Sequence, residues 1–189
     1  MIADGYPWKQ DLKIQKDLLL KYNNPEEFDV DDEEFYVNVE KSIFYSAFII
    51  RKLIDSYERL SDDACRYSIR VREIKPLKPI NRKCFWSEAD SHDWENERST
   101  VRDAKYICNS LIHSHIFFFR KDENDRDMCF FVSSDYDINK VLYKISFSDW
   151  LKYINYVIED NVVSMSISFD KEKEEYVCKS KKRGILKNL

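Results

Sequence analysis

Four polar side chains that could do chemistry fall on one side of a helix predicted near the middle of the chain. The stretch STVRDAKYICNSLIHSH runs from 99 to 115, and at 100° per residue it points Arg102, Tyr106, Asn109 and His113 the same way within about 60°. An arginine offers a fixed fork of donors that suits phosphate, and a histidine titrates near neutral pH and can transfer protons. These four residues are therefore the candidate binding face.

The other side of the same stretch is apolar, as expected for a helix that packs against a core. It consists of Val101, Ala104, Ile107, Cys108, Leu111 and Ile112. Because Arg102 and His113 would lie three turns apart, roughly 16 Å, they cannot meet on one small group within a single helix. A shared site would need a long ligand such as RNA, or a dimer that brings Arg102 of one subunit near His113 of the other. The structural alternative is a solvated helix face.

Histidines raise the question of a metal site. His113 and His115 are two residues apart, and on a helix their rings point about 200° apart, so they cannot share an ion there. We expect His115 to be a hydrogen-bonded core residue at a helix-to-strand junction. His92 lies among acidic residues that could hold a divalent ion, but a solvated acidic loop is the commoner outcome. The sequence predicts no metal and no cofactor.

Basic residues are concentrated in two places. The strand-like stretch near 70 has Arg66, Arg70 and Arg72 with Tyr67 between them, and the C-terminal tail has Lys179, Lys181, Lys182, Arg183 and Lys187. Both groups could contact phosphates, and a tyrosine could stack on a base. An ordinary charged edge strand and a disordered tail explain them equally well.

Composition excludes several classes of function. The 189 residues are 43% hydrophobic and 35% charged, which fits one globular domain with a sizeable core. The formal net charge of -4 gives no global attraction to nucleic acid, so such binding would need a local basic patch. Only Gly5 and Gly184 are glycine, and this excludes phosphate-binding loops, dinucleotide folds and nucleophile elbows, which need internal glycines.

Cysteine usage and hydropathy indicate a cytoplasmic protein. The five cysteines form an odd set with no C-x-x-C pair, which fits reduced thiols better than disulfides or a zinc site. The N-terminus has no apolar run of signal-peptide length, and no segment reaches the roughly 18 apolar residues that a spanning helix needs. We therefore expect no membrane role.

The order of elements predicts an α+β fold, in which N-terminal helices, one of them long, precede a mostly antiparallel sheet with one intervening helix. Helices are expected at 10–22 and 32–60, and the middle of the second, IFYSAFII, has almost no polar side. This segment must be covered all round by other elements or by a partner, and a second subunit is a plausible cover. A strand at 67–74 and a long acidic surface loop at 80–97 should follow.

Beyond the candidate helix the hydrophobic period changes to two. HIFFFRK, DMCFFVS, KVLYKISF and NVVSMSISFD read as strands, SDWLKYINYVIED as the intervening helix with a Ser148 cap, and EEYVCKSK as a last strand. We expect a single domain over 1–189. Its helical part covers about 10–115, its strand-rich part about 116–180, and a flexible basic tail 181–189.

The six residues CNSLIH, from Cys108 to His113, resemble the Arg-polar-x-x-x-His motif of HEPN-type helical proteins. As in those proteins, the motif is predicted on a helix that follows a long N-terminal helix. Many proteins of that type are RNases or RNA- and nucleotide-associated modules of bacterial toxin and antiviral systems, and they generally act as dimers. By position, Asn109 matches the polar residue, His113 matches the histidine, and Cys108 stands where the arginine should be. The resemblance therefore implies a degenerate, non-catalytic relative. The pairing of FYSAFIIRKL with CNSLIHS also resembles a bacterial protein family with no assigned activity.

Three functions remain open. The first is a cytoplasmic binding or regulatory component, a homodimer or a subunit of a larger complex, associated with RNA or nucleotide through Asn109, Tyr106, His113 and Arg102. The second is a metal-independent RNase that uses His113 as general acid/base, with Arg102 of the facing subunit supplying positive charge. The third is a protein-protein adaptor without nucleic-acid affinity.

Overall fold

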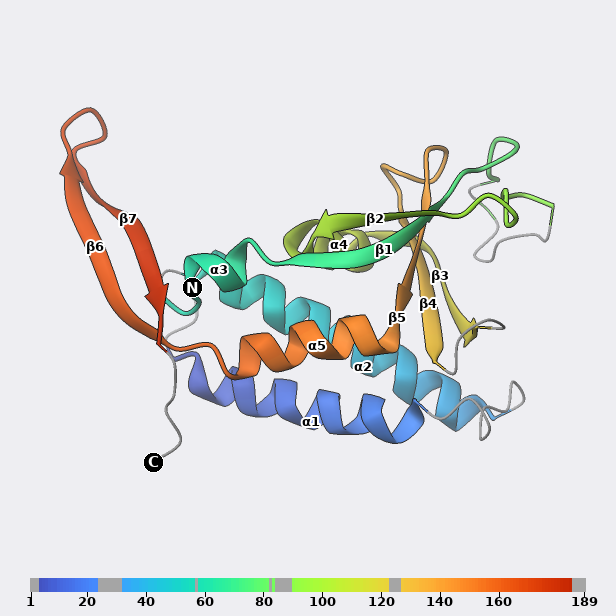
Figure 1. Cartoon of the computed structure of the whole chain (residues 1–189), viewed down its shortest axis with the longest axis horizontal. Helices are drawn as coiled ribbons and strands as arrows, with labels where there is room; N and C mark the ends of the chain where they lie inside the picture. Colours follow the sequence, from blue (N-terminus) through green and yellow to red (C-terminus); the bar gives the residue numbers. More distant parts are fainter. Residues whose placement is uncertain are drawn as a thin grey trace.

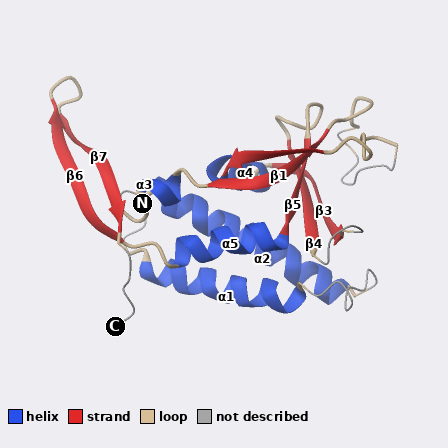
Figure 2. Ribbon diagram, in the orientation of Figure 1, coloured by secondary structure: helices blue, strands red, loops and turns tan. Residues whose placement is uncertain are grey.

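A computed structural model gives the fold of the chain. It describes residues 4–23, 32–56, 58–81, 83, 90–122 and 127–184, and every structural statement below concerns these residues. The elements follow in the order α1 (Tyr6–Tyr22), α2 (Glu33–Asp55), α3 (Asp62–Cys65), β1 (Ser68–Ile74), β2 (Arg98–Asp103), α4 (Ala104–Ile112), β3 (Ser114–Lys121), β4 (Met128–Ser134), β5 (Leu142–Ser146), α5 (Phe147–Ile158), β6 (Val162–Asp170) and β7 (Glu175–Arg183). The predicted α+β class is confirmed (Figure 2).

Five strands form one antiparallel sheet in the order β2-β1-β5-β4-β3, and β6 and β7 form a separate hairpin. Helices α1, α2 and α5 pack against one another beside the sheet, and α4 packs against α2 (Figure 1). The hairpin lies at the far end of the molecule from β3 and β4, beside α3.

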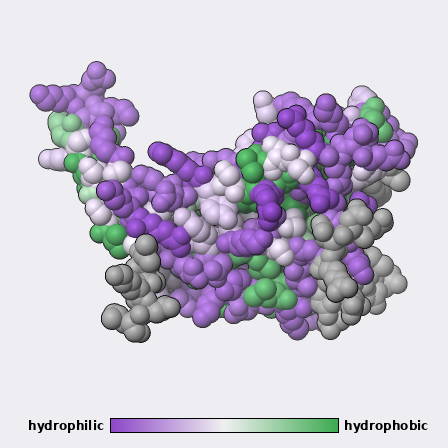
Figure 3. Space-filling model, in the orientation of Figure 1, coloured by the Kyte–Doolittle hydropathy of each residue, from purple (hydrophilic) through white to green (hydrophobic). Residues whose placement is uncertain are grey.

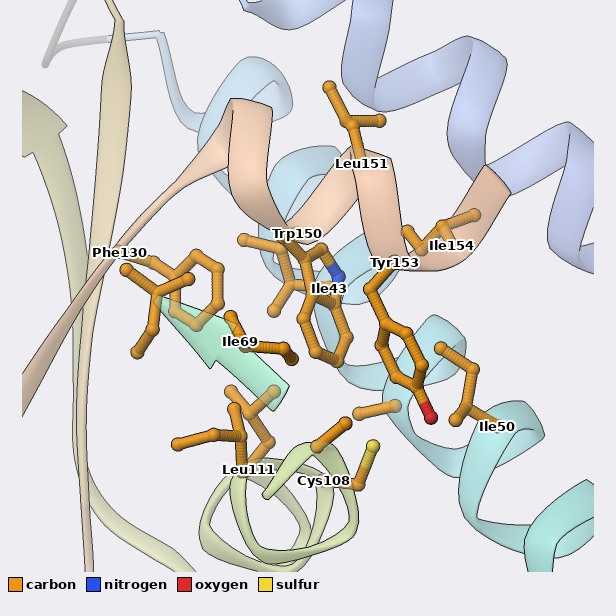
Figure 4. Packing of buried hydrophobic residues seen from close by; sticks show 14 of the residues in the cluster. Ile43, Ile50, Ile69, Cys108, Leu111, Phe130, Trp150, Leu151, Tyr153 and Ile154 are labelled. Atoms are coloured by element: carbon orange, nitrogen blue, oxygen red, sulfur yellow. The ribbon is translucent and has the colours of Figure 1, made fainter. Parts of the chain in front are cut away.

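The main core lies between the helices and one face of the sheet. Trp150 and Tyr153 of α5 reach toward Ile43 and Ile50 of α2 (Figure 4), and both aromatic residues are almost completely buried. The indole Nε1 of Trp150 donates to Ser46 Oγ at 3.0 Å, which satisfies a polar group inside the core. A serine in the middle of the apolar segment of α2 is therefore a hydrogen-bonding partner of the neighbouring helix.

The segment IFYSAFII of α2 is covered on most sides by other elements, as its composition predicts. Ile43, Ser46, Ala47, Ile49 and Ile50 are buried. Phe44 packs on Phe117 of β3, with ring centroids 4.6 Å apart. Tyr45 and Phe48 stay 40% and 39% exposed, so one side of the segment remains uncovered by the described residues.

The second face of the sheet carries a smaller cluster. Strand β4 is buried along its whole length, because Phe130 and Val132 face the main core while Cys129 and Phe131 face the other side. Trp94 lies edge-on to Phe131 at 5.9 Å. The predicted acidic surface loop is thus partly wrong: the described part, 90–97, packs on this second face, and the remainder of 80–97 is described only at 80, 81 and 83.

The predicted helix over 99–115 is too long at both ends. Residues Arg98–Asp103 form β2, which pairs with β1 from Ser68 to Glu73, and the helix begins only at Ala104. The backbone N–H and C=O groups of RSTVRD are satisfied by pairing with β1. Asp103 then caps α4, because its side chain accepts from the Tyr106 N–H at 3.2 Å. Arg102 is therefore on a strand.

Other helices and strands also begin or end at residues that differ from the predicted ones. The long helix predicted over 32–60 ends at Asp55, and α5 is capped by Ser146, whose hydroxyl accepts from the Asp149 N–H, and not by Ser148. The tail predicted to be flexible from 181 is part of β7 up to Arg183, and residues 185–189 lie outside the described residues. Among the described helices, none is long and apolar enough to cross a bilayer.

Candidate functional site

Arg102 and Tyr106 come together through a third residue, Tyr143 of β5. The Arg102 guanidinium forms an ion pair with Glu73 and lies 5.8 Å from the centre of the Tyr143 ring. The Tyr106 ring meets the same ring edge-on at 5.9 Å. Two of the four predicted residues thus share one aromatic neighbour, although they lie on a strand and a helix and not on one helical face.

The hydroxyl of Tyr106 is hydrogen-bonded to a buried carboxylate, that of Asp137. It donates to Asp137 Oδ2 at 2.6 Å, and Ser134 Oγ donates to the same oxygen at 2.9 Å. Burial of the phenol, together with this hydrogen bond, raises the pKa of Tyr106 well above its ordinary value. Tyr106 is therefore neutral and held in place at physiological pH.

Asn109 joins α4 to α2. Its side-chain oxygen accepts from Arg51 Nε at 2.6 Å, and one turn away Lys105 pairs with Asp55 at 3.4 Å. His113 follows at the C-cap, where its backbone N–H donates to the Asn109 carbonyl at 2.9 Å and its side chain is exposed. The structure thus separates Asn109 and His113 from Arg102 and Tyr106 in their contacts. It does not gather the four residues into one site.

The other two histidines have protein neighbours. His115 Nδ1 lies 3.3 Å from Asp135 Oδ1 at the start of β3, close to the expected helix-to-strand junction. His92 is buried, with Nδ1 2.8 Å from Ser91 Oγ, and its burial lowers its pKa. The described residues contain no group of three or more His, Cys, Asp or Glu side chains placed to hold a metal ion.

A polar cavity of about 330 Å³ lies where β1 separates from β5, and we call it the fork pocket. Strand β1 pairs with β5 only from Arg72 to Ile74, whereas β5 continues along β4 to Ser146 and turns into α5. The gap that opens is lined by Arg70, Val71, Arg72, Ser99, Thr100, Asp122, Asp127, Cys129, Lys144, Ser146, Ser148, Asp149 and Lys152. Its volume is at the lower end of the range of small-molecule sites.

The inner wall of the fork pocket is a charge cluster centred on Lys144 and Asp122, whose side chains are buried. Lys144 Nζ lies 3.0 Å from Asp122 Oδ2 and 3.2 Å from both carboxylate oxygens of Glu97. Arg72 is the partner of Lys144 across the two strands and pairs with Glu97 at 3.2 Å. The Cys129 thiol donates to Asp122 at 3.5 Å, and burial and the neighbouring carboxylate raise its pKa to about 12.

The outer rim of the fork pocket is exposed. Arg70 and Lys152 both pair with Asp149, at 2.7 and 3.3 Å, while their side chains remain 69% and 59% exposed. Burial acts to raise the pKa of Asp149, but the hydrogen bonds from the two cations outweigh it and hold this pKa below its usual range.

Asp127 holds the start of α5. Its Oδ2 accepts from the Ser148 N–H at 3.2 Å, in the first turn of the helix. Its Oδ1 is buried and accepts no hydrogen bond from the described residues.

Sequence reasoning singled out Arg70 and Arg72 but missed the pocket to which they belong. Asp122, Asp127, Lys144 and Asp149 come from separate elements with no diagnostic spacing, and strand pairing alone brings them together. The one available signal was a lysine in the otherwise apolar strand VLYKISF, since a buried lysine requires a carboxylate partner.

The comparisons with known proteins give no identification. No family model, no curated protein and no solved structure matches this chain.

Proposed function

We propose that this protein is a binding component that takes a small phosphorylated ligand of the nucleotide class into the fork pocket. The observation that carries the proposal is that four cationic side chains from β1, β5 and α5 converge on one cavity beside four hydroxyl groups. Arginine and lysine make charge-assisted hydrogen bonds to phosphate oxygens, and serine and threonine hydroxyls can donate further ones. This extends the expectation of an RNA- or nucleotide-associated component to a specific cavity.

The rim cations are available to an incoming phosphate. Exposed ion pairs such as those of Arg70 and Lys152 with Asp149 contribute little to stability, because water and salt screen them. Both side chains are exposed enough to donate to a ligand oxygen while they stay beside Asp149. Lys144 and Arg72 are paired with Glu97 and Asp122, so they offer a ligand fixed N–H donors and little net charge.

The pocket also favours a ligand that carries hydrogen-bond donors, because three carboxylates line it beside the cations: Asp122, Asp127 and Asp149. An amino or hydroxyl group of a nucleotide would donate to one of these carboxylates, whereas inorganic phosphate reaches only the cations and the hydroxyl groups. A nucleoside without phosphate would leave the cations unused.

Binding is favoured over catalysis by the state of the pocket's thiol. With a pKa raised to about 12, Cys129 stays protonated at neutral pH and is a poor nucleophile. Its proton is directed to Asp122, which Lys144 also contacts. In the part of the chain that the structure describes, no histidine lines this cavity.

Isothermal titration with the four ribonucleoside monophosphates, the matching nucleosides and inorganic phosphate tests the proposal. At least one monophosphate should saturate with one site, and its affinity should exceed that of its nucleoside and of phosphate by tenfold or more, or about 1.4 kcal/mol. Raising the salt concentration should weaken the binding, because part of it is electrostatic.

A double substitution at the rim gives the matched comparison. Arg70→Gln with Lys152→Gln removes two exposed cations without disturbing the core and should weaken monophosphate binding by tenfold or more. Lys13→Gln, on the exposed side of α1, removes a cation elsewhere and should leave binding unchanged. The proposal is wrong if no monophosphate saturates the wild-type protein or if the rim variant binds as tightly as the wild type.

A further inference from the structure

Strand β1 has an open edge beside the fork pocket. Its neighbours in the sheet are β2 and β5, but β5 pairs with it only from Arg72 to Ile74. From there β5 runs to the start of α5, whereas the first half of β1 lies towards α3 (Figure 1). Among the described strands, this first half of β1 is therefore paired on one side only, with β2.

The strand register shows which residue of β1 faces the open edge. In an antiparallel pair, successive residues turn their main-chain N–H and C=O groups alternately towards the partner strand and away from it. The Ala104 N–H donates to the Tyr67 carbonyl at 2.8 Å, and these two residues continue the β1–β2 register by one step. The odd-numbered residues of β1 therefore bond β2. Arg70, between Ile69 and Val71, turns its N–H and C=O to the other side, towards the fork pocket that it lines.

The pairing of β1 with β5 agrees with this assignment. Arg72 lies opposite Lys144, so in the same register Arg70 would lie opposite Ser146. Ser146 is instead the N-cap of α5, and the pairing with β1 ends before it. The part of the chain that would have covered the main chain of Arg70 thus begins a helix.

The main chain at Arg70 is held firmly on its other side. The adjacent side chains of Ile69 and Val71 are only 1% and 3% exposed and belong to the main core. Tyr67 stacks on Tyr153 of α5, with ring centroids 4.8 Å apart. The Arg70 N–H is therefore a donor fixed in place before a ligand arrives, whereas the exposed side chains of the rim lose conformational freedom when they bind.

We propose that the main-chain N–H of Arg70 donates to the phosphate of the ligand, together with the Arg70 guanidinium and the Lys152 ammonium. This role rests on the function proposed for the fork pocket and identifies the donor that fixes the phosphate there. The two side chains converge on Asp149, at 2.7 and 3.3 Å, so they mark a place at the rim that two cations reach. The C=O of Arg70 turns the same way as its N–H and can accept from a ligand hydroxyl or amino group.

Charge favours the rim over the inner wall as the place of the phosphate. The rim has two cations and one carboxylate, a formal charge of +1, from Arg70, Lys152 and Asp149. The inner wall has two cations and two carboxylates, a formal charge of zero, from Lys144, Arg72, Asp122 and Glu97. Figure 3 shows mostly hydrophilic residues along α5, which suits a charged group at the surface. Main-chain N–H groups are common donors to phosphate, since they need no charge to do so.

Amide hydrogen exchange of the full-length protein, followed by NMR, tests the proposal. In the free protein the Arg70 amide should exchange at least tenfold faster than those of Ile69 and Val71, because only these two bond β2. The ribonucleoside monophosphate that titrates most tightly, at a saturating concentration, should slow Arg70 by tenfold or more. It should leave Ser68 unchanged, because Ser68 faces the same edge but does not line the pocket. The matching nucleoside should protect none of them, since it has no phosphate.

Proline substitution gives a second test with a matched control. Arg70→Pro removes the guanidinium and the N–H, whereas Arg70→Ala removes the guanidinium alone. Proline is tolerated in a strand where its N–H would face away from the ladder, so Arg70→Pro should keep the wild-type circular dichroism. It should bind the monophosphate tenfold or more less tightly than Arg70→Ala. Val71→Pro, one residue further on, removes an N–H that bonds β2 and should lower the unfolding midpoint strongly.

The outcomes separate this role from the proposed function. If no monophosphate saturates the wild type, the proposed function is wrong and the role of Arg70 falls with it. If a monophosphate binds but the Arg70 amide exchanges equally fast with and without it, the pocket holds its ligand through other groups and only the role of Arg70 is wrong. An Arg70 amide as slow as that of Ile69 in the free protein would also overturn it. Because exchange is measured on the wild type, it decides the matter even if Arg70→Pro fails to fold.

Discussion

Replacing Lys144 with methionine should reveal how strongly the charge cluster of the fork pocket is coupled. Lys144→Met keeps most of the buried stem but removes the ammonium that lies 3.0 Å from Asp122 and 3.2 Å from Glu97. The Asp122 side chain is only 4% exposed, and its next cation, Arg72, is 3.9 Å away. Removing one partner of a buried pair typically costs about 3–5 kcal/mol, and we expect a loss in this range.

A double-mutant cycle of Lys144→Met and Asp122→Asn tests whether that loss of stability arises from an uncompensated charge. Asp122→Asn in the Lys144→Met background removes the carboxylate that lost its partner, so the double variant should be more stable than Lys144→Met alone. The coupling energy between the two sites should then be about 1.5 kcal/mol or more, as expected for contacting residues. Urea unfolding, followed by tryptophan fluorescence and by circular dichroism, gives the free energy of unfolding of the wild type, the two single variants and the double variant.

Additive losses within about 0.5 kcal/mol would refute this reasoning. Additivity would mean that water already screens Lys144 from Asp122, so the inner wall of the pocket would not be a low-dielectric cluster. A changed urea slope in one variant would instead indicate an altered unfolded or native state and would exclude that variant from the cycle.

Three further outcomes follow from the contacts of the candidate residues. Tyr106→Phe should lower stability by about 1–3 kcal/mol in urea unfolding, because it takes the 2.6 Å donor from Asp137, and an unchanged stability would contradict the committed role of this phenol. His113→Ala should change stability by less than about 0.5 kcal/mol, and total RNA incubated in EDTA with either protein should stay intact on a gel; cleavage lost in the variant would support the RNase instead. Burial lowers the pKa of His92, so the unfolded chain takes up the proton first and stability should fall as pH drops below about 6.5, by up to about 1.4 kcal/mol per pH unit. His92→Gln should flatten that fall in unfolding measured from pH 7.5 downward, and identical slopes would contradict it.

The sequence predicts elements whose signals are local. The long apolar helix around Ile43, the period-two strands and the helix around Trp150 follow from hydrophobic spacing, and the structure confirms them within a few residues, although the last of these helices is capped by Ser146 and not by the predicted Ser148. The spacing within 99–115 predicts one helix wrongly, because Arg102 and Tyr106 are four residues apart although one lies on β2 and the other on α4. Strand pairing between β2 and β1, a non-local interaction, decided the structure of RSTVRD.

The candidate site also depends on non-local contacts, which spacing along the sequence does not predict. Spacing along one segment suggested Arg102, Tyr106, Asn109 and His113, yet each of the first three has a protein partner from another element: Glu73, Asp137 and Arg51. Those partners lie 29, 31 and 58 residues away in the chain. The fork pocket, conversely, is assembled only by sheet topology, so no sequence window contains it.

Helix α5 links the fork pocket to the root of the β6–β7 hairpin. The helix begins at the fork pocket, where Ser146 and Asp127 accept from its first N–H groups, and ends near Asp160, which accepts from the Ser61 N–H at 2.7 Å and anchors the root of the hairpin. The rim variant replaces Lys152 within α5, but this side chain is exposed and pairs with Asp149, so the two caps are left in place. A loss of ligand binding in the rim variant therefore reports on the rim itself when the circular dichroism and the urea unfolding of the variant match those of the wild type.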